Sequence, residues 1–348
     1  MPGVLTDDIV VVKDQREGCQ LFNKGNFGYP MRGGGTQLDL VEAVFLVECD
    51  RLEVEYEGRK MAFDDMFSYA SSVSEGFDIK YLVYRDIRQR GFVVKQETGG
   101  FDFSVFPRGS TMSNSRPIYM VRAVSERTAL DITKFAAEIS QTENRGKKLL
   151  YGVVDEEGDL TYYIMSMQDP VGDVYGEAER CLKGTLISDR VFVFSSEDAE
   201  ELRKAGFYGK MMEGILQLSL IEGCYLCSTG QLEISSNDGT PMSYGELRDF
   251  GTKVQDEFDL RMKAFADLRK RGLVVKTGFK YGTHFRVYER SPDECHARYL
   301  VHAVPASKVT MWPEISRTVR LSGGVKKEIL FCRISDKVEY LEFKWFRP

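Results

Sequence analysis

The chain has 348 residues, of which 43% are hydrophobic and 29% charged, a composition typical of a folded protein with room for two domains. No apolar run approaches the roughly 20 residues that cross a bilayer, and the N-terminus does not resemble a signal peptide, so we expect a cytoplasmic protein without membrane contact. The net charge of −6 argues against a nonspecific nucleic-acid coat and restricts any RNA site to a local basic patch.

The first half of the chain is predicted to alternate between strands and helices. An opening strand is expected at residues 9–12, and a later helix over residues 81–91 ends at Gly91, because glycine readily takes the conformation that stops a helix. Three short β-rich runs, a second helix and two final strands follow; their ranges are 92–95, 101–106, 118–124, 129–142, 149–155 and 160–166.

The same order returns about 180 residues later. LVEAVFL at 40–46 matches LIEGCYL at 220–226, and DIRQRGFVVK at 86–95 matches DLRKRGLVVK at 267–276. The second copy predicts strands at 190–194, 329–334 and 338–345, and helices at 258–272 and 313–321. An offset that is stable to two residues across most of the chain indicates an internal duplication.

We therefore expect an α+β fold of two tandem homologous units. Each unit consists of a small N-terminal α/β piece followed by a mixed-sheet module of order αβββαββ. The units span residues 1–167 and 186–348, and a linker at 168–185 joins them where Pro170 and Gly172 interrupt the pattern.

Two short motifs allow both a functional and a structural interpretation. Cys224 and Cys227 have the spacing of metal ligands, but no second pair accompanies them, so we expect two small side chains packed in a helix. The odd number of seven cysteines favours free thiols. GFYG at 206–209, matched by GNFG at 25–28, could cradle a phosphate, although a shared structural turn is favoured.

Three ionisable side chains stand together only in the second unit. Tyr288 ends a predicted strand, His296 lies in the following loop and Lys327 begins a later strand. Such a set could move protons at a phosphodiester: one group accepts the proton of a 2′-hydroxyl, one protonates the leaving 5′-oxygen, and the ammonium stabilises the charged phosphorus centre. Histidine suits the proton donor near neutral pH. Tyrosine suits the base only if a cation such as Lys327 lowers its pKa from about 10.

The segments around these residues resemble the catalytic domain of archaeal tRNA-splicing endonucleases, and the first unit resembles it more weakly. The matching segments are RGLVVKTGFKYG at 271–282, FRVYER at 285–290, HARYLV at 296–301 and VKK at 325–327. The resemblance implies an RNA endonuclease that excises introns from precursor tRNA at bulge-helix-bulge elements and leaves 2′,3′-cyclic phosphate and 5′-hydroxyl ends. It also implies that Tyr288, His296 and Lys327 are catalytic and that no metal or cofactor is needed.

The first unit differs at these positions. Phe106 replaces the tyrosine and lacks its hydroxyl, and Arg116 replaces the histidine and keeps its proton at physiological pH. At an offset of 181 residues, Lys327 falls opposite Gly146. We therefore interpret the first unit as a degenerate structural repeat and the second as the catalytic one.

The resemblance further implies a homodimer, since family members of this fused type pair to present two active sites to the two bulges of one RNA. The last hairpin of the first unit carries Asp155, Glu156, Glu157 and Asp159. In the family, such an acidic loop docks into a basic pocket on the active unit of the other chain.

Other cations and histidines also have expected roles. Arg320 resembles a family arginine that stacks on a flipped-out bulge base together with a second cation, for which Lys344 is the first candidate and Arg347 the second. His302 lies in a predicted strand and is expected to be structural. His284 stands where relatives tend to have a smaller polar or acidic residue, and its role stays open.

Two other functions remain open. A metal-dependent nuclease could use Asp293 with Glu342 and Lys344, although 49 residues separate the two carboxylates. A non-catalytic RNA-binding or scaffold protein would use both units for recognition only. Arg286 and Arg290 are expected to be solvated charges, with phosphate contact as the alternative.

Overall fold

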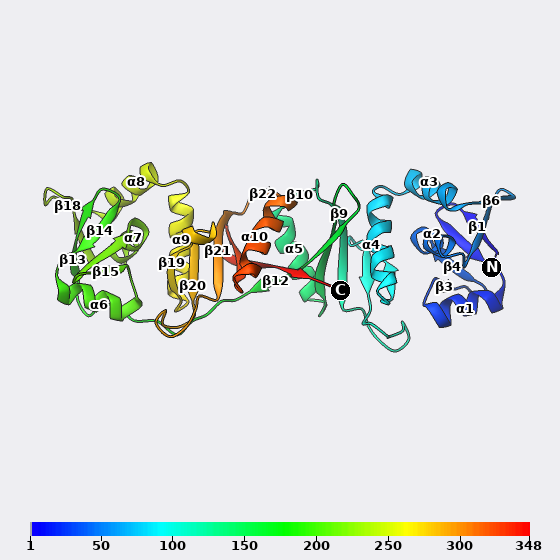
Figure 1. Ribbon diagram of the computed structural model, residues 1–348, viewed down its shortest axis with the longest axis horizontal. Coiled ribbons are helices and arrows are strands. Elements are labelled where there is room, and N and C mark those ends of the chain that lie inside the picture. The colour runs from blue at the N-terminus through cyan, green and yellow to red at the C-terminus, as the bar shows by residue number, and fades with distance from the viewer. Residues whose placement is uncertain (1) are drawn as a thin grey trace.

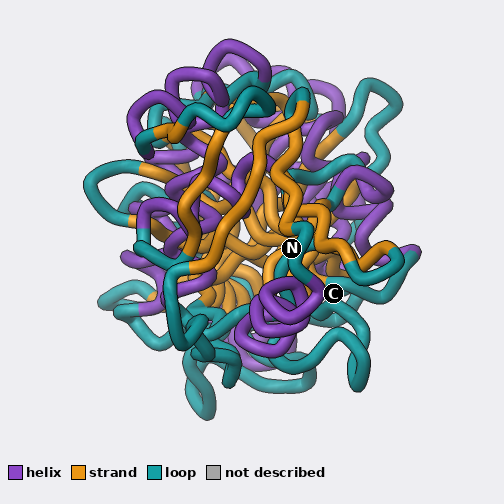
Figure 2. Tube along the Cα trace, turned by 90° about the vertical axis from the view of Figure 1, so that its left-hand side faces the viewer, coloured by secondary structure: helices purple, strands orange, loops and turns teal. Residues whose placement is uncertain are grey.

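A computed structural model describes residues 2–348 and shows an elongated molecule (Figure 1). The N-terminal domain of the first unit lies at one end, that of the second unit lies at the other, and the two C-terminal domains meet in the middle. Viewed along the long axis, the strands lie at the centre and helices surround them (Figure 2). The predicted α+β fold of two tandem units is confirmed.

Each N-terminal domain contains a six-stranded sheet and three helices, with strand orders β3-β4-β2-β1-β5-β6 and β15-β16-β14-β13-β17-β18. The first contains β1 (Pro2–Thr6), β2 (Ile9–Val12), α1 (Gln15–Gly25), β3 (Tyr29–Pro30), β4 (Thr36–Asp39), α2 (Leu40–Glu48), β5 (Glu53–Tyr56), β6 (Arg59–Met61) and α3 (Phe63–Val73). The second contains β13 (Leu182–Ile187), β14 (Arg190–Val193), α6 (Ser196–Gly206), β15 (Lys210–Met212), β16 (Ile215–Ser219), α7 (Leu220–Ser228), β17 (Leu232–Ser235), β18 (Pro241–Met242) and α8 (Tyr244–Val254).

Strands β1 and β13 were not predicted. β13 begins at Leu182, so its first four residues lie inside the segment 168–185 that the sequence suggested as a linker. Pro2 and Gly3 in β1 and Gly184 in β13 are residue types that argue against a strand. Each strand is held by a parallel neighbour about 50 residues away in sequence, as Leu182 pairs with Leu232, and a local pattern cannot reveal such a partner.

The C-terminal domains contain the remaining elements. In the first unit these are α4 (Phe77–Gln89), β7 (Val94–Gln96), β8 (Phe103–Val105), β9 (Tyr119–Ser125), β10 (Ala129–Asp131), α5 (Ile132–Glu143), β11 (Lys148–Val154) and β12 (Leu160–Gln168). In the second they are α9 (Phe258–Lys270), β19 (Val274–Thr277), the 3-10 turn η1 (Phe279–Tyr281), β20 (Phe285–Tyr288), β21 (Tyr299–Pro305), β22 (Val309–Met311), α10 (Trp312–Gly324), β23 (Glu328–Ile334) and β24 (Val338–Phe346).

The predicted ends of α4 and α9 are correct, because Gly91 and Gly272 follow them with φ of 88° and 74°. The helix expected at 129–142 begins later, at Ile132. Asp131 caps it by accepting hydrogen bonds from the N–H groups of Thr133 and Lys134, and β10 precedes it. β10 pairs with β22 of the second unit, and this contact between units is invisible in the local sequence.

One ten-stranded sheet runs through both C-terminal domains in the order β19-β20-β21-β23-β24-β12-β11-β9-β8-β7. Its middle pair, β12 and β24, is antiparallel, and Met165 lies opposite Phe343. Leu130 likewise lies opposite Thr310 in the pair β10 and β22. Because equivalent residues face each other in both pairs, the two C-terminal domains are related by an approximate two-fold axis.

The hydrophobic cores follow this arrangement. Each unit buries one core between its sheets and helices, and a third core joins the two units where α5 and α10 cover the middle of the central sheet. Trp312 is fully buried there and stacks on Tyr163 of the other unit, with ring centroids 5.5 Å apart. Within residues 2–348, no helix is both long and apolar enough to span a membrane.

Candidate active site

The ends of three neighbouring strands bring the predicted catalytic segment together. Tyr288 ends β20, and Arg298, just before β21, donates its backbone N–H to the Val287 carbonyl at 3.0 Å. Glu328 at the start of β23 donates its N–H to the Arg298 carbonyl at 3.0 Å. The segment that leads from His296 into β21 therefore runs between Tyr288 on one side and Lys327, the residue before Glu328, on the other.

Lys327 contacts the histidine loop directly. Its ammonium donates a hydrogen bond to the Ala297 carbonyl at 2.7 Å. Ala297 also packs with Tyr288 in a small cluster that includes Cys295, so both chain neighbours of His296 belong to the cluster around Tyr288. His296 itself is exposed. The structure thus gathers the three predicted residues around one end of β20, β21 and β23.

The pKa of the Tyr288 phenol is raised, whereas the role of a base predicted from the sequence required a cation such as Lys327 to lower it. The residue is 8% exposed, and burial raises the pKa of its phenol. The cation that opposes this rise is Arg286, whose guanidinium carbon lies 5.9 Å from the ring centroid. Lys327 was expected to lower the pKa of the phenol, but its ammonium binds the Ala297 carbonyl instead.

Tyr281 is a neighbour of the site that the sequence pattern did not single out. Its ring centroid lies 5.9 Å from the Lys327 ammonium, and its proximity to Tyr288 adds to the rise in that phenol's pKa. The corresponding loop of the first unit, residues 97–101, is one residue shorter and contains no tyrosine. The difference between the two copies was the signal that could have identified Tyr281.

The structure corrects the counterpart of Lys327 in the first unit. Lys147 donates its backbone N–H to Thr142 at 3.1 Å, just as Lys327 donates to Ser322 at 3.0 Å, and each residue directly precedes a strand. The offset here is therefore 180 residues, and Lys147 rather than Gly146 matches Lys327. The sequence comparison was therefore off by one residue. Gly146 and its counterpart Lys326 both take the left-handed turn conformation, but a glycine and a lysine share no residue type that would reveal this correspondence.

The other two counterparts agree with the sequence comparison. Ile118 donates its N–H to Val105 at 2.8 Å, in the same way as Arg298 donates to Val287. Phe106 therefore occupies the position of Tyr288, and Arg116 lies two residues before Ile118, as His296 lies two residues before Arg298. The first unit retains the lysine and lacks the phenol and the imidazole.

The other two histidines form a half-buried pair away from this strand end. The rings of His284 and His302 stack with centroids 4.3 Å apart. Burial, together with His302 and Arg261, lowers the pKa of His284 to about 3, and burial also lowers the pKa of His302. His302 lies in β21, as the sequence predicted, and its ring stacks on that of His284.

A groove of about 840 Å³ lies beside the C-terminal end of α10. Arg320 and Arg347 both line it, and the guanidinium of Arg347 lies 5.2 Å from the Trp345 ring centroid. Lys344 is not among the residues that line the groove. Arg347, the second candidate, therefore shares the groove with Arg320, and Lys344 does not.

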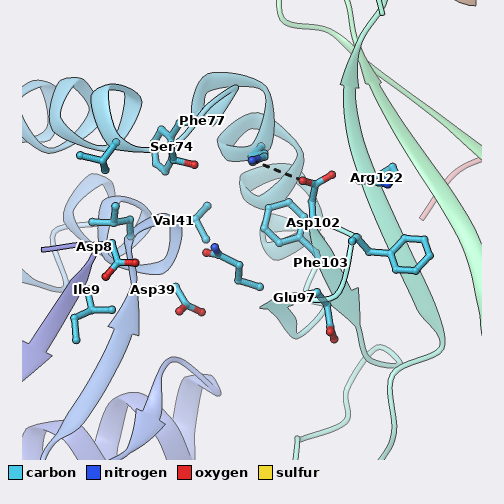
Figure 3. Close-up of a pocket in the computed structure, with 16 residues that line it drawn as sticks. Asp8, Ile9, Asp39, Val41, Ser74, Phe77, Glu97, Asp102, Phe103 and Arg122 are labelled. Carbon is cyan, nitrogen blue, oxygen red and sulfur yellow. Dashed lines mark ion pairs between the residues drawn. The ribbon is translucent and has the colours of Figure 1, made fainter. Parts of the chain in front are cut away.

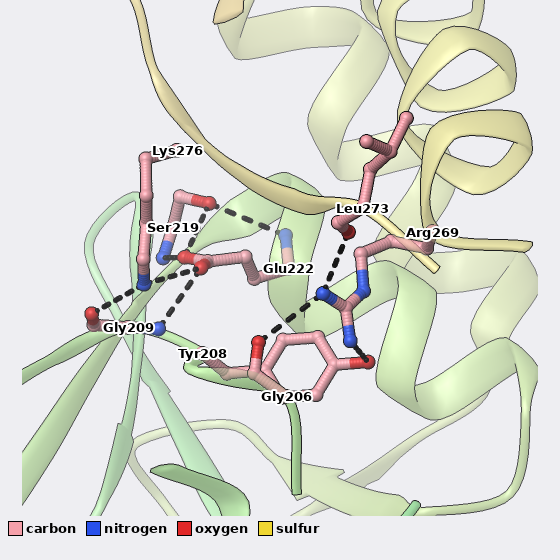
Figure 4. Close-up of polar contacts among 8 residues, drawn as sticks. All are labelled: Gly206, Tyr208, Gly209, Ser219, Glu222, Arg269, Leu273 and Lys276. Atoms are coloured by element: carbon pink, nitrogen blue, oxygen red, sulfur yellow. Dashed lines mark hydrogen bonds and ion pairs between the residues drawn. The ribbon is translucent and has the colours of Figure 1, made fainter. Parts of the chain in front are cut away.

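The GFYG motif at 206–209 is a structural turn (Figure 4). Gly209 donates its N–H to Glu222 at 2.9 Å, so this donor is not available to a phosphate, and its carbonyl accepts from the Lys276 ammonium at 2.8 Å. Arg269 donates to the Gly206 carbonyl at 3.2 Å. The bonds donated by Lys276 and Arg269 join the two domains of the second unit. Equivalent bonds join those of the first, where Lys95 donates to the Gly28 carbonyl at 2.9 Å and to Glu42 at 2.6 Å.

No group of three or more histidine, cysteine, aspartate or glutamate side chains within residues 2–348 is arranged to hold a metal ion. Cys224 is buried and Cys227 half-buried in α7, as expected for packed side chains. Asp293 lies 3.6 Å from Arg203 of α6, whereas Glu342 of β24 accepts a hydrogen bond from Gln168 at 2.8 Å. The two carboxylates of the metal-dependent alternative are thus engaged on different elements.

The first unit contains an acidic cavity of about 400 Å³ between its two domains (Figure 3). Its lining includes Asp8, Asp39, Glu97 and Asp102. Lys80 lies 3.8 Å from Asp102. The strand registers put Asp189, Ser219, Gly278 and His284 at the four equivalent positions of the second unit, which therefore keeps only one of these carboxylates.

Comparison with known proteins agrees with the duplication. The family model of the tRNA intron endonuclease N-terminal domain matches residues 1–67 and 182–248, and that of the catalytic C-terminal domain matches residues 77–162 and 258–340. The chain is similar to the tRNA-splicing endonucleases of Methanococcoides burtonii (35% identical over 336 residues, 93% of both chains) and Methanosarcina barkeri (37% over 342 residues, 95% of this chain and 96% of the relative). It is also 32% identical over 356 residues to that of Halobacterium salinarum, covering 97% of this chain and 96% of the relative. With matches to both domains in both units and relatives aligned over nearly their whole length, the chain belongs to the tRNA intron endonuclease family.

Proposed function

We propose that this protein excises introns from precursor tRNA at bulge-helix-bulge elements by metal-independent transphosphorylation, leaving 2′,3′-cyclic phosphate and 5′-hydroxyl ends. The observation that carries the proposal is the hydrogen bond from Lys327 to the loop of His296 beside Tyr288. The first unit contains only the lysine of this set.

The proposed reaction exchanges one phosphorus–oxygen bond for another. The 2′-oxygen attacks phosphorus and loses its proton to Tyr288, while the bond to the 5′-oxygen breaks and His296 protonates the leaving oxygen. Lys327 stabilises the extra negative charge on the phosphoryl oxygens. Only the phenolate form of Tyr288 can accept the proton, so positive charge near the phenol favours the active form.

The decisive experiment is incubation of a short bulge-helix-bulge RNA with the protein in EDTA, followed by analysis of the product ends. We expect cleavage at both bulges with cyclic phosphate ends. A nuclease that uses metal-bound water would give no cleavage in EDTA. Tight binding without cleavage would instead favour the non-catalytic scaffold and overturn the proposal.

We also propose a homodimer in which the acidic hairpin docks on the second unit of the other chain. Asp155 shapes this hairpin, since its carboxylate accepts the N–H groups of Glu157 and Asp159 at 3.0 and 2.9 Å, and Glu156 pairs with Arg127. Glu157 and Asp159 are exposed and form no ion pair within residues 2–348. Their carboxylates are therefore available for docking.

The second unit offers a matching cation. Arg261 is half-buried next to His284, burial lowers its pKa, and its guanidinium has no ion pair within residues 2–348. The double substitution Glu157→Lys and Asp159→Lys is expected to convert the dimer to monomer in light scattering and to reduce cleavage. Replacing Asp155 would disturb the turn itself, so Asp155 stays unchanged. An unchanged mass and rate would refute the docking.

A further inference from the structure

Arg286 lies next to the proposed base in an unusual state for an arginine. It stands two residues before Tyr288 on β20, so both side chains point to the same face of the sheet. Its guanidinium carbon is 5.9 Å from the phenol ring centroid, within the range of attraction between a cation and an aromatic ring. The side chain is half-buried, contrary to the expectation of a solvated charge.

Within residues 2–348, the Arg286 side chain forms no hydrogen bond and no ion pair, and its Nε is buried without a partner. Other arginines near this region are paired, as Arg298 is with Glu289 at 2.6 Å. Keeping a cation partly out of water without a counter-ion costs free energy. Such unfavourable arrangements concentrate at functional sites, where a charge is needed for chemistry.

The comparison of the two units supports this interpretation. Ser104 occupies the position of Arg286 in the first unit, because Ser104 pairs with Met120 and Arg286 pairs with Leu300, the equivalent residue. Ser104 is buried, so a small side chain fits this place in the sheet without loss of the fold. The second unit thus has Arg286 together with Tyr288, and the first unit has Ser104 together with Phe106.

Several other groups face Tyr288 or Arg286. Tyr281 of η1 and Cys295 of the histidine loop raise the pKa of the Tyr288 phenol, and the loop also carries His296. Lys276 of β19 lies opposite Arg286 and binds the Gly209 carbonyl and Glu222. The Lys327 ammonium is bound to the Ala297 carbonyl. Arg286 is the cation whose proximity to the ring opposes the rise in the pKa of the Tyr288 phenol.

We propose that Arg286 is a positioning residue that acts through Tyr288, by supplying the positive charge that favours the phenolate form in the cleavage step. The role of Arg286 in cleavage rests on the proposed function, whereas its effect on the ionisation of the Tyr288 phenol does not. At any pH below the pKa of the phenol, each unit of increase in that pKa reduces the phenolate fraction tenfold.

The direct test follows the ionisation of Tyr288 by NMR of protein labelled with ¹³C at tyrosine Cζ, with Tyr288→Phe assigning the signal. We expect the titration midpoint to move to higher pH by about one unit or more in Arg286→Ser, the residue that the first unit carries, and in Arg286→Met. Arg286→Lys keeps the charge and is expected to retain the wild-type midpoint. Arg290→Met removes an exposed cation two residues after Tyr288 and serves as the matched control.

The second test measures single-turnover cleavage of the bulged RNA. Arg286→Ser is expected to cleave at least tenfold more slowly at neutral pH, with a deficit that shrinks as the pH rises, while RNA binding stays within a few-fold of wild type. A pure loss of RNA affinity with an unchanged Tyr288 titration would overturn the proposal and make Arg286 a phosphate contact. If wild type does not cleave but its Tyr288 titration still depends on Arg286, the proposed function fails and the electrostatic coupling stands.

Discussion

His284 and Asp102 accept the same hydrogen bond in the two units. The Nδ1 atom of His284 accepts the N–H of Ala303 at 3.1 Å, and the carboxylate of Asp102 accepts the N–H of Ala123 at 2.9 Å. His284 therefore carries its proton on Nε2 and acts as a fixed acceptor for the backbone of β21. This relationship explains why an imidazole stands at a position where a smaller polar or acidic side chain would also serve.

A neutral acceptor should replace His284 without loss of function. We expect His284→Asn to fold and to cleave bulged RNA within a few-fold of wild type, because its carbonyl can accept the Ala303 N–H. His284→Ala leaves that N–H without a partner and is expected to lower the free energy of unfolding by about 1–3 kcal/mol. Urea unfolding measures both variants. A loss of cleavage in a fully stable His284→Asn would place this residue in the chemistry.

The depressed pKa of His284 also predicts a dependence of stability on pH. Its pKa is about 3 in the folded protein and about 6.5 when unfolded, so between these values the unfolded chain binds the extra proton. The folded state should therefore lose stability as the pH falls below about 6.5, by up to about 1.4 kcal/mol per pH unit. Urea unfolding from pH 7 to pH 4.5 should show a weaker slope for His284→Asn. Equal slopes would contradict this origin.

Substitution of the exposed His296 should separate chemistry from folding. We expect His296→Ala to slow cleavage by about 10²–10⁴-fold, the usual contribution of a positioned acid or base. Because the side chain is exposed, the melting temperature should stay close to that of wild type. Lys326→Ala, an exposed cation next to Lys327, is the control and should retain cleavage. A His296→Ala protein that cleaves normally would remove this residue from the mechanism.

The groove beside α10 predicts which cation partners Arg320. We expect Arg320→Ala and Arg347→Ala to reduce cleavage of bulged RNA by a similar factor of about ten, since a cation over the face of a flipped-out base would contribute about 0.5–2 kcal/mol. Lys344→Ala should leave the rate unchanged, because the residue does not line the groove. Single-turnover rates of the three variants decide the matter. A large effect of Lys344→Ala alone would restore the first candidate.

The buried pair of Lys95 and Glu42 holds the two domains of the first unit together. Their side chains are 3% and 0% exposed, so Lys95→Met leaves an uncompensated buried carboxylate and should cost about 3–5 kcal/mol of unfolding free energy. The double variant Lys95→Met and Glu42→Gln should recover most of this loss. Chemical denaturation measures both. A single variant as stable as wild type would show that water reaches the pair.

Local pattern predicted the fold class, the duplication and most elements of the C-terminal domains, because hydrophobic periodicity and glycine stops act over a few residues. It missed β10 and β22, which exist only through their pairing with each other across the units. The local pattern also aligned Lys327 with Gly146, because the turn that Gly146 and Lys326 share is formed by different residue types in the two units. The backbone hydrogen bonds, rather than the residue types, identify Lys147 as the counterpart of Lys327.

The sequence alone determined that the chain contains an internal duplication and that only the second copy carries the phenol of Tyr288 and the imidazole of His296, because residue identity is a property of the chain. The tertiary structure decided what surrounds them: the ammonium bound to the histidine loop, the guanidinium beside Tyr288 that has no partner within residues 2–348, and the arginine that shares a groove with Arg320. Burial and charge proximity arise from strands far apart in the chain, and pKa values depend on both.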